Sequence, residues 1–482
     1  MRKTCAREED SLLQTQCNQE SFEFHALNQR EVTGRFDGGT ITSDAGGLLL
    51  REVEKRTAII ERFAACFRDH RDPVRVDHTT KELVAQRVYA LALGYEDLND
   101  HDELRRDPLL AVLAEKPDPT GESRARERDR GKALAGKSTL NRLELTKAAV
   151  EKKERYKKIA LDTEGVDRLL VEIFLEAHAT PPSEIVLDLD ATDDPVHGNQ
   201  EGRFFHGYYG HYCYLPLYIF CGGFLLGARL RPSNIDASAG SLEEVKRIVA
   251  QIRQAWPQVK ITVRGDSGFC REELMAWCEQ GGVYYVLGLV KNERLKAEIV
   301  EELEQARQQY AETGKAARVF KEFVYQTRDS WTRARRVVAK AEHLEKGSNP
   351  RFVVTSHPAE AWPAQRLYED LYCARGEMEN RIKEQLVLFA DRTSTAFLRS
   401  NQIRLYFSSI AYGVMEALRR LGLKATDLAQ AQCETIRLKV LKIGALIRIT
   451  VRKVWVSMAG GYPGAERWAR IYAALQSLPL RC

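Results

Sequence analysis

The sequence predicts an α/β protein with a mixed five-stranded sheet flanked by helices, preceded by a helical region and followed by a mainly helical one. Short segments rich in β-branched and aromatic residues lie between residues 181 and 289, separated by helical periodicity. Residues 40–178 and the residues after 366 show mostly helical periodicity. Because 482 residues are too many for one compact core, we expect two to four structural units.

The chain before the sheet is predicted to hold a tail and a helical domain. Residues 1–30 are polar and lack clear periodicity, which predicts a flexible tail. Residues 31–180 are predicted to form an N-terminal helical domain, with a break rich in Pro, Gly and Glu around residues 116–122. The Pro181-Pro182 pair marks the end of this domain.

The sheet is predicted from five strands and two helices. The expected strands span residues 185–190, 212–221, 224–230, 260–266 and 283–289. The Gly222-Gly223 pair suits a hairpin, and helices over residues 241–255 and 271–280 separate the later strands. This order predicts three strands followed by parallel crossover connections. Residues 181–289 and 366–398 are together assigned to this core.

An insertion is predicted between the fifth strand and the next long helix. Residues 290–365 contain a charged helix and then strand-like segments at 319–325, 336–341 and 351–356, which predicts a β-rich subdomain that interrupts the sheet. Helical periodicity returns over residues 371–390. Residues 399–482 are predicted to be mainly helical and are basic, with fourteen Lys or Arg against four Asp or Glu.

Composition narrows the class of protein. No apolar stretch follows the charged start of the chain, and the apolar run 214–230 is broken by the glycine pair, so neither a signal peptide nor a membrane span is predicted. The ten cysteines include no C-x-x-C pair, which argues against a zinc site or a disulfide framework and favours a reducing, cytoplasmic location. A second basic stretch covers residues 124–158, and such runs are either solvated surfaces or binding sites for a polyanion.

Carboxylates follow two of the predicted strands. Alternation along residues 185–190 places Asp188 and Asp190 on one face, and Asp266 ends the strand 260–266. The strand ends of an open α/β sheet are where ligands bind, and a divalent cation compensates buried carboxylates. Alternatively, Asp190 turns the chain and Asp266 begins a helix.

A third carboxylate lies on the predicted helix 371–390. Helical spacing places Tyr372, Arg375, Glu379 and Lys383 in one narrow stripe beside an apolar stripe. Such a helix can pack by its apolar side and present the polar stripe to a ligand. The alternative is a ridge of surface ion pairs at i,i+4 spacing.

These motifs resemble those of the DDE-type insertion-sequence transposases, specifically the DDE group 1 transposases. The likeness rests on Asp190-Ala191-Thr192, on RGDSGF around Asp266, and on Tyr372-x-x-Arg375-x-x-x-Glu379. It extends to LAQRVYALALGYEDLNDHDELRRDP, LAGKSTLNRLE and SNQIRLYFSSIAY, and so covers most of the chain. One departure is Leu386, where related transposases often carry a Lys; Lys383 is the nearest substitute.

The resemblance implies a ribonuclease H-like core with a β-rich insertion. It also implies that the protein is a Mg²⁺-dependent endonuclease that transfers strands. Two Mg²⁺ ions, with Mn²⁺ as a substitute, would be held about 4 Å apart by Asp190, Asp266 and Glu379. Tyr372, Arg375 and Lys383 would contact DNA, and Trp331 would stack on an unpaired base. The choice of Asp190 over Asp188 rests mainly on the Asp-Ala-Thr context.

The resemblance also implies partners and a location. The N-terminal helical domain and the basic C-terminal region would bind double-stranded DNA, both terminal inverted repeats and target DNA, with a homodimer on the DNA. The protein would need no nucleotide cofactor or membrane and would be cytoplasmic and associated with the nucleoid.

The sequence also raises three other functions. Gly131–Ser138 matches the phosphate-binding G-x-x-x-x-G-K-[ST] motif, but the charged residues before it cannot form the required strand, so Ser138 or Thr139 is expected to cap a helix instead. A ribonuclease H-like nuclease without strand transfer would share every site residue. A transposase-derived DNA-binding protein is disfavoured by three intact carboxylates.

Overall fold

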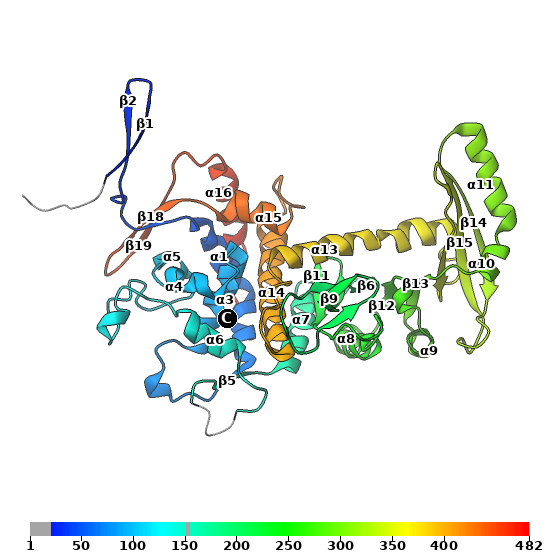
Figure 1. The fold of residues 1–482 in the computed structure, drawn as a ribbon, viewed down its shortest axis with the longest axis horizontal. Coiled ribbons are helices and arrows are strands. Elements are labelled where there is room, and N and C mark those ends of the chain that lie inside the picture. The colour runs from blue at the N-terminus through cyan, green and yellow to red at the C-terminus, as the bar shows by residue number, and fades with distance from the viewer. Residues whose placement is uncertain (1–20, 151–154, 482) are drawn as a thin grey trace, which may run out of the picture.

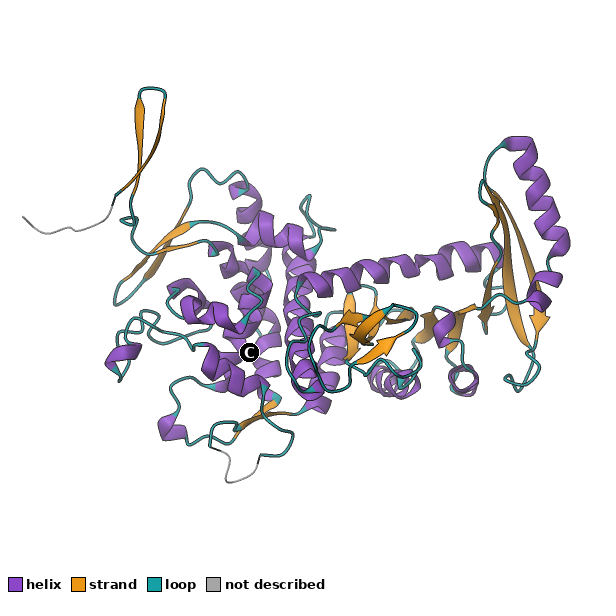
Figure 2. Ribbon diagram, viewed as in Figure 1, coloured by secondary structure: helices purple, strands orange, loops and turns teal. Residues whose placement is uncertain are grey.

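A computed structural model describes residues 21–150 and 155–481 (Figure 1). The start of the chain, most of the predicted tail and residues 151–154 of the second basic stretch lie outside these ranges. The molecule is elongated, with a mostly helical part at one end, a sheet through the middle and an insertion at the other end (Figure 2). None of the described helices is both long and apolar enough to cross a membrane.

The five predicted strands form one end of a larger mixed sheet, in the order β11-β10-β6-β12-β13, with β11 at the edge. The first three strands pair antiparallel, and β12 and β13 run parallel to β6. The predicted mixed sheet with flanking helices is confirmed. The elements of this region are β6 (Glu184–Ala191), β7 (Asp194–Pro195), β8 (Phe204–His206), β9 (His211–Tyr214), β10 (Leu217–Cys221), β11 (Phe224–Arg229), α8 (Ser241–Ala255), β12 (Lys260–Gly265), η5 (Ser267–Phe269), α9 (Glu272–Gln280) and β13 (Tyr284–Leu289).

Strands of the insertion extend this sheet, so the predicted number of five strands is too low. Strand β17 pairs antiparallel with β13, and β15 and β14 continue outward to give a nine-stranded sheet. The backbone edge of the buried strand β13 needs hydrogen-bond partners, and β17 supplies them. The insertion contains α10 (Glu293–Ala297), α11 (Val300–Thr313), β14 (Ala317–Tyr325), β15 (Arg335–Leu344), β16 (Gly347–Ser348) and β17 (Arg351–Thr355).

Helices cover both faces of the sheet. Val245 and Ile252 of α8 and Leu274 of α9 pack into the apolar core under one face. A long interrupted helix crosses the other face, where Leu367 and Leu371 pack on the central strands (Figure 1). Its segments are α12 (Ala364–Arg366), the π-helical turn η6 (Leu367–Tyr372), η7 (Cys373–Arg375) and α13 (Gly376–Val387). This helix therefore carries its polar residues across the sheet.

The helices before and after the sheet share one hydrophobic core. Helix α14 packs against α1 and α3 on one side and against β11 on the other. The N-terminal elements are β3 (Ile41–Thr42), η1 (Ala45–Gly47), α1 (Leu48–Thr57), α2 (Ile59–Ala65), β4 (Phe67–Asp69), η2 (Pro73–Arg75), α3 (Thr80–Leu93), η3 (Leu98–Asp100), α4 (His101–Leu104), α5 (Pro108–Leu113), η4 (Glu127–Asp129), α6 (Lys137–Glu144), β5 (Ile159–Leu161) and α7 (Thr163–Glu176). The C-terminal elements are α14 (Leu398–Leu418), η8 (Arg419–Leu423), α15 (Cys433–Ile436), η9 (Arg437–Leu441), β18 (Ala445–Ile449), β19 (Val454–Met458) and α16 (Ala465–Gln476).

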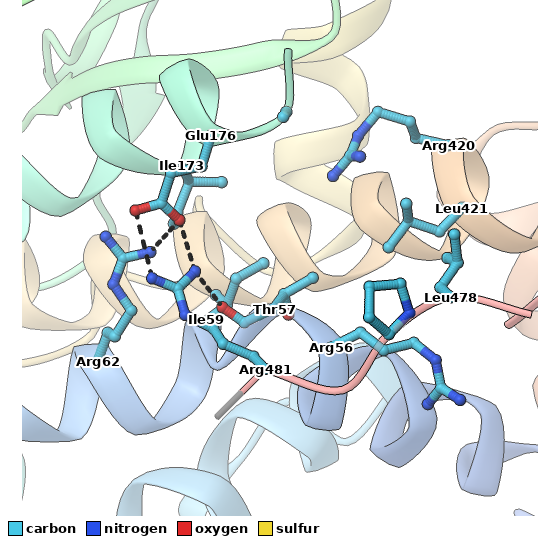
Figure 3. A pocket seen from close by; sticks show the side chains of 12 residues that line it. Arg56, Thr57, Ile59, Arg62, Ile173, Glu176, Arg420, Leu421, Leu478 and Arg481 are labelled. Carbon is cyan, nitrogen blue, oxygen red and sulfur yellow. Dashed lines mark hydrogen bonds and ion pairs between the residues drawn. The ribbon is translucent and has the colours of Figure 1, made fainter. Parts of the chain in front are cut away.

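A cavity of about 200 Å³ lies where the C-terminal segment meets these helices (Figure 3). Glu176 accepts hydrogen bonds from Arg62 and Arg481, and Arg481 also donates to the carbonyl of Thr57. The cavity is lined by elements that carry none of the predicted site residues. Its ion pairs fasten the C-terminal segment to the N-terminal helices.

Three segments differ from the sequence-based expectation. A hairpin of β1 (Phe22–Leu27) and β2 (Arg30–Gly34) occupies the last part of the predicted tail, because apolar and polar residues alternate there and Asn28 adopts a positive φ at the turn. The strand expected over 212–221 is split into β9 and β10 by Pro216, which cannot donate to a ladder. The predominantly helical C-terminal region includes the hairpin β18–β19, which pairs with β3.

The expected cap of helix α6 is also wrong. The helix begins after Gly136, so Ser138 and Thr139 lie inside its first turn, and the N–H of Lys137 is bound by the side chain of Asp102. Residues 114–136, all of which the structure describes, contain no strand. The phosphate-binding motif therefore lacks the strand that would deliver its glycine loop.

Candidate active site

Asp190 and Asp266 lie at neighbouring strand ends. In the parallel pairing of β6 with β12, Leu189 is opposite Gly265, so Asp190 and Asp266 follow at the next position. Asp190 is largely buried, with 16% of its side chain exposed. Asp266 caps the turn η5 by accepting the N–H of Gly268 at 2.8 Å. Two carboxylates thus meet at the carboxyl edge of the sheet, where open α/β sheets bind ligands.

The interrupted helix brings Arg375 and Glu379 to the same edge. The Arg375 guanidinium lies 3.8 Å from Asp190 and 3.7 Å from Glu379, between the two carboxylates. Arg375 is 20% exposed and Glu379 is 55% exposed, so the group runs from the buried strand end to the surface. Within the described chain, one guanidinium nitrogen of Arg375 is buried without a hydrogen-bond partner.

Burial controls the protonation of Asp190. Loss of solvent raises the pKa of Asp190 to about 6, Arg375 opposes this rise, and the charges of Asp266 and Glu379 add to it. The charges of Asp266 and Glu379 therefore both act on Asp190. A cation placed among them would relieve the repulsion.

The carboxylate donors have the chemistry that Mg²⁺ prefers, but the arrangement is not closed around an ion. Among the residues that the structure describes, no group of three His, Cys, Asp or Glu side chains is placed to hold a metal ion. The Arg375 guanidinium occupies the space between Asp190 and Glu379. The chemistry of these carboxylates therefore suits a divalent cation, although the described side chains as placed do not enclose one.

Gly288 makes room for the Tyr372 side chain to approach the same site. A Cβ atom on Gly288 of β13 would lie 2.7 Å from the Tyr372 hydroxyl and 2.8 Å from the backbone nitrogen of Ser267. Both distances are too short for any other residue, so Gly288 lets Tyr372 pack against the turn that follows Asp266. Burial raises the pKa of Tyr372, which keeps its hydroxyl protonated as a donor.

Sequence reasoning missed a buried ion pair beneath the site. Asp188 binds the guanidinium of Arg264 at two points, one of them 2.7 Å, and both side chains are buried. Arg264 also donates to the carbonyl of Leu371, at 2.5 Å. Asp188 is therefore bound by Arg264, whereas Asp190 lies near the carboxylates of Asp266 and Glu379. Arg264 precedes Asp266 by two residues, as Asp188 precedes Asp190, so strand alternation could have signalled this pair.

The structure places the remaining predicted residues outside the group of Asp190, Asp266 and Glu379. Lys383 is exposed one turn after Glu379, and Leu386 is exposed further along α13. Trp331 is only 6% exposed and packs edge-to-face on Tyr325. Stacking on a base would require its ring to leave this packing.

Comparison with known proteins identifies the chain. The family model for the transposase DDE domain, group 1, matches residues 24–480. The chain belongs to this transposase family. No curated protein matches it. Solved structures that resemble it include a piggyBac transposase, in a cryo-EM structure of its synaptic complex with hairpin DNA, at 12% identity and a TM-score of 0.42, over 82% of this chain and 79% of that one.

The protein is thus a DNA transposase, an enzyme that cleaves DNA and transfers the strands. Enzymes of this family act with divalent metal ions. The transposase resemblance drawn from the three sequence motifs is confirmed.

Proposed function

We propose that the transposase cleaves transposon ends and joins them to target DNA at a single site formed by Asp190, Asp266 and Glu379. The observation that carries this proposal is the meeting of Asp190, Asp266 and the Arg375–Glu379 turn at one edge of the sheet. Two divalent ions, Mg²⁺ or Mn²⁺, would activate an attacking oxygen and stabilise charge on the leaving oxygen. Asp190, Asp266 and Glu379 would hold these ions.

The remaining residues of the site would bind the substrate. Arg375, released from the carboxylates, can grip a non-bridging phosphate oxygen with its planar fork, and the Tyr372 hydroxyl can donate to a second oxygen. Both groups hold the strand in line with the attacking oxygen. Lys383, exposed one turn after Glu379, would contact the DNA backbone.

A ribonuclease H-like core is part of the proposal. The strand order β11-β10-β6-β12-β13, with three antiparallel strands followed by two parallel ones, supports it. We propose that residues 181–289 and 366–398 form this catalytic unit. DNA affinity would reside in the helices of residues 31–180 and in residues 399–482, in a homodimer on the DNA.

The hairpin β18–β19 would contact DNA within the C-terminal region. Arg448, Arg452 and Lys453 are all exposed, and residues 443–458 include no acidic residue. Within the described chain, none of the three forms an ion pair with a carboxylate, and Arg448 and Lys453 lie over the ring of Trp455. A two-stranded ribbon fits the major groove of B-form DNA.

The proposal is tested by separating catalysis from binding. Glu379→Gln should abolish cleavage of a transposon end while end binding without divalent metal stays nearly unchanged. Glu377→Gln is the matched control, because Glu377 is an exposed glutamate two residues earlier on the same helix. A strand-transfer assay then distinguishes a transposase from a nuclease, because only the transposase yields joined products. Loss of end binding together with cleavage would contradict the assignment.

A further inference from the structure

A hairpin of exposed aromatic residues follows the catalytic strand β6. Residues 203–212, here called the aromatic hairpin, have the sequence RFFHGYYGHY and include strand β8 and the start of β9. Phe205 is 58% exposed, Tyr208 87% and Tyr212 47%. Large apolar rings grouped in solvent usually mark a binding surface.

The base of the aromatic hairpin is fixed to the protein. Strand β9 pairs with β7, and Ser233 donates a hydrogen bond of 2.9 Å to the carbonyl of Phe204. Just after the hairpin, Tyr214 donates to the carbonyl of Glu201 at 2.8 Å. Strand pairing and hydrogen bonds therefore hold the base of the aromatic hairpin in place, so the exposure of the rings does not come from an unattached loop.

The hairpin also adjoins the carboxylates. His211 lies 2.8 Å from Asp193, which follows Asp190 by three residues. Burial raises the pKa of Tyr209 to about 12, and the charges of Asp193 and Asp190 add to this rise. A strand held at Asp190 would therefore run beside the aromatic hairpin.

Two of the exposed rings form a cluster with an arginine. Phe205 and Tyr212 lie opposite each other on neighbouring strands, edge to face, with ring centroids 5.6 Å apart. The guanidinium of Arg203 lies 4.6 Å from the centroid of the Tyr212 ring. Within the described part of the chain, Arg203 forms no ion pair with a carboxylate, so its charge is available to a phosphate.

We propose that the aromatic hairpin binds unpaired bases of the DNA end beside the scissile phosphate, by stacking on Phe205, Tyr208 and Tyr212. Aromatic rings accept any base by its flat face, and an adjacent Arg neutralises the backbone. The inference rests on the proposed position of the active site. A contact with another protein would also cover apolar rings, but the charge of Arg203, which no carboxylate of the described residues neutralises, and the neighbouring carboxylate site favour nucleic acid.

The test compares a forked duplex, carrying a four-nucleotide single-stranded end with 2-aminopurine, with the same duplex blunt-ended. Binding is measured without divalent metal. The wild-type protein should bind the fork about tenfold more tightly and quench 2-aminopurine fluorescence, since one stacked base contributes roughly that factor. Phe205→Leu and Tyr208→Ala should each remove most of this preference and the quenching, and Phe205→Trp should retain both.

Matched controls make the test decisive. Phe24→Leu removes a 63% exposed ring of strand β1, outside the segments assigned to DNA binding, and should leave binding of both duplexes unaffected. Equal weakening on fork and blunt duplex, or unchanged fork binding, would overturn the proposal. A change in oligomeric state on sedimentation with normal DNA binding would also overturn it, in favour of a protein contact. Because no cleavage is measured, an error in the carboxylate assignment would appear only in the Glu379→Gln experiment.

Discussion

Arg264 and Asp188 form a buried two-point ion pair that joins strands β12 and β6 directly beneath the proposed active site. The same guanidinium donates to the carbonyl of Leu371, in the residue before Tyr372. One side chain thus connects the two strands that end in Asp190 and Asp266 with the helix that carries Arg375. We infer that Arg264 is a positioning residue.

The first prediction concerns this ion pair. Asp188→Asn should lower the free energy of unfolding by about 3 kcal/mol or more, because it leaves the buried charge of Arg264 without its partner. Denaturant unfolding followed by circular dichroism measures the change. Asp188→Leu combined with Arg264→Met should recover much of the stability, since both charges are removed together. Cleavage should stay low in the double variant, because the contact with the Leu371 carbonyl is also lost.

The second prediction uses the titration of Asp190. The folded-state pKa of about 6 lies above the ordinary value of about 3.9, so the unfolded chain releases this proton at lower pH. The free energy of unfolding should therefore fall as pH rises from about 4 to 6, by about 3 kcal/mol. Asp190→Asn should be more stable than the wild type at pH 8 without metal, and similar to it at pH 4.

Metal binding gives this prediction its control. Addition of Mg²⁺ at pH 8 should raise the melting temperature of the wild type, because a cation relieves the repulsion among the carboxylates. It should raise that of Asp190→Asn much less. A lower melting temperature for Asp190→Asn at pH 8, as expected for Asp188→Asn, would show that Asp190 is bound within the protein.

The third prediction concerns the hairpin β18–β19. Replacement of Arg448, Arg452 and Lys453 by Ala should reduce the slope of log affinity against log salt by about two to three, since each lost phosphate contact contributes about 0.9. Fluorescence anisotropy with duplex DNA between low and physiological salt measures the slope. The matched control replaces Lys291, Lys315 and Lys346, three exposed lysines of the insertion. If both triple variants reduce the slope by the same amount, the hairpin β18–β19 makes no specific contribution to DNA binding.

Local patterns predicted much of the fold. Helix α8 spans the predicted residues 241–255, because its apolar side packs under the sheet while charged residues face solvent. Asp190 and Asp266 were predicted at neighbouring strand ends, and the parallel register of β6 and β12 places them side by side. Such features depend on periodicity and strand direction, which the sequence carries.

Features that depend on pairing partners were not predicted. The pairing of β17 with β13 joins segments far apart in the chain, and strand-like residues alone do not say which edge they meet. The hairpin β18–β19 was missed although residues 445–449 alternate between buried and outward-facing positions, because neighbouring helical periodicity was extended over it. The position of Arg375 between two carboxylates depends on the irregular turns η6 and η7, which ideal helical spacing does not describe.

The last prediction is that Arg375 serves the DNA substrate. Its distances to Asp190 and Glu379 exceed those of a direct hydrogen bond, and one of its buried nitrogens has no hydrogen-bond partner among the described residues. A buried donor left unpaired is unfavourable unless another state of the molecule supplies an acceptor. A phosphate oxygen held by the metal ions would be such an acceptor.

Arg375→Ala should therefore leave the fold intact and reduce cleavage about a hundredfold, which corresponds to roughly 2 to 4 kcal/mol for a lost charge-stabilising donor. If Arg375 formed only an i,i+4 ion pair with Glu379, its loss would change the free energy of unfolding by only about 0.3 to 0.5 kcal/mol and leave turnover unchanged. Arg375→Lys is the sharper variant, because it keeps the charge but loses the planar fork. Rates are compared on intact and pre-nicked ends, with melting temperatures as the control for folding. Near-normal cleavage by both variants would reduce Arg375 to a structural residue, because a phosphate ligand cannot be removed without slowing the step that it positions.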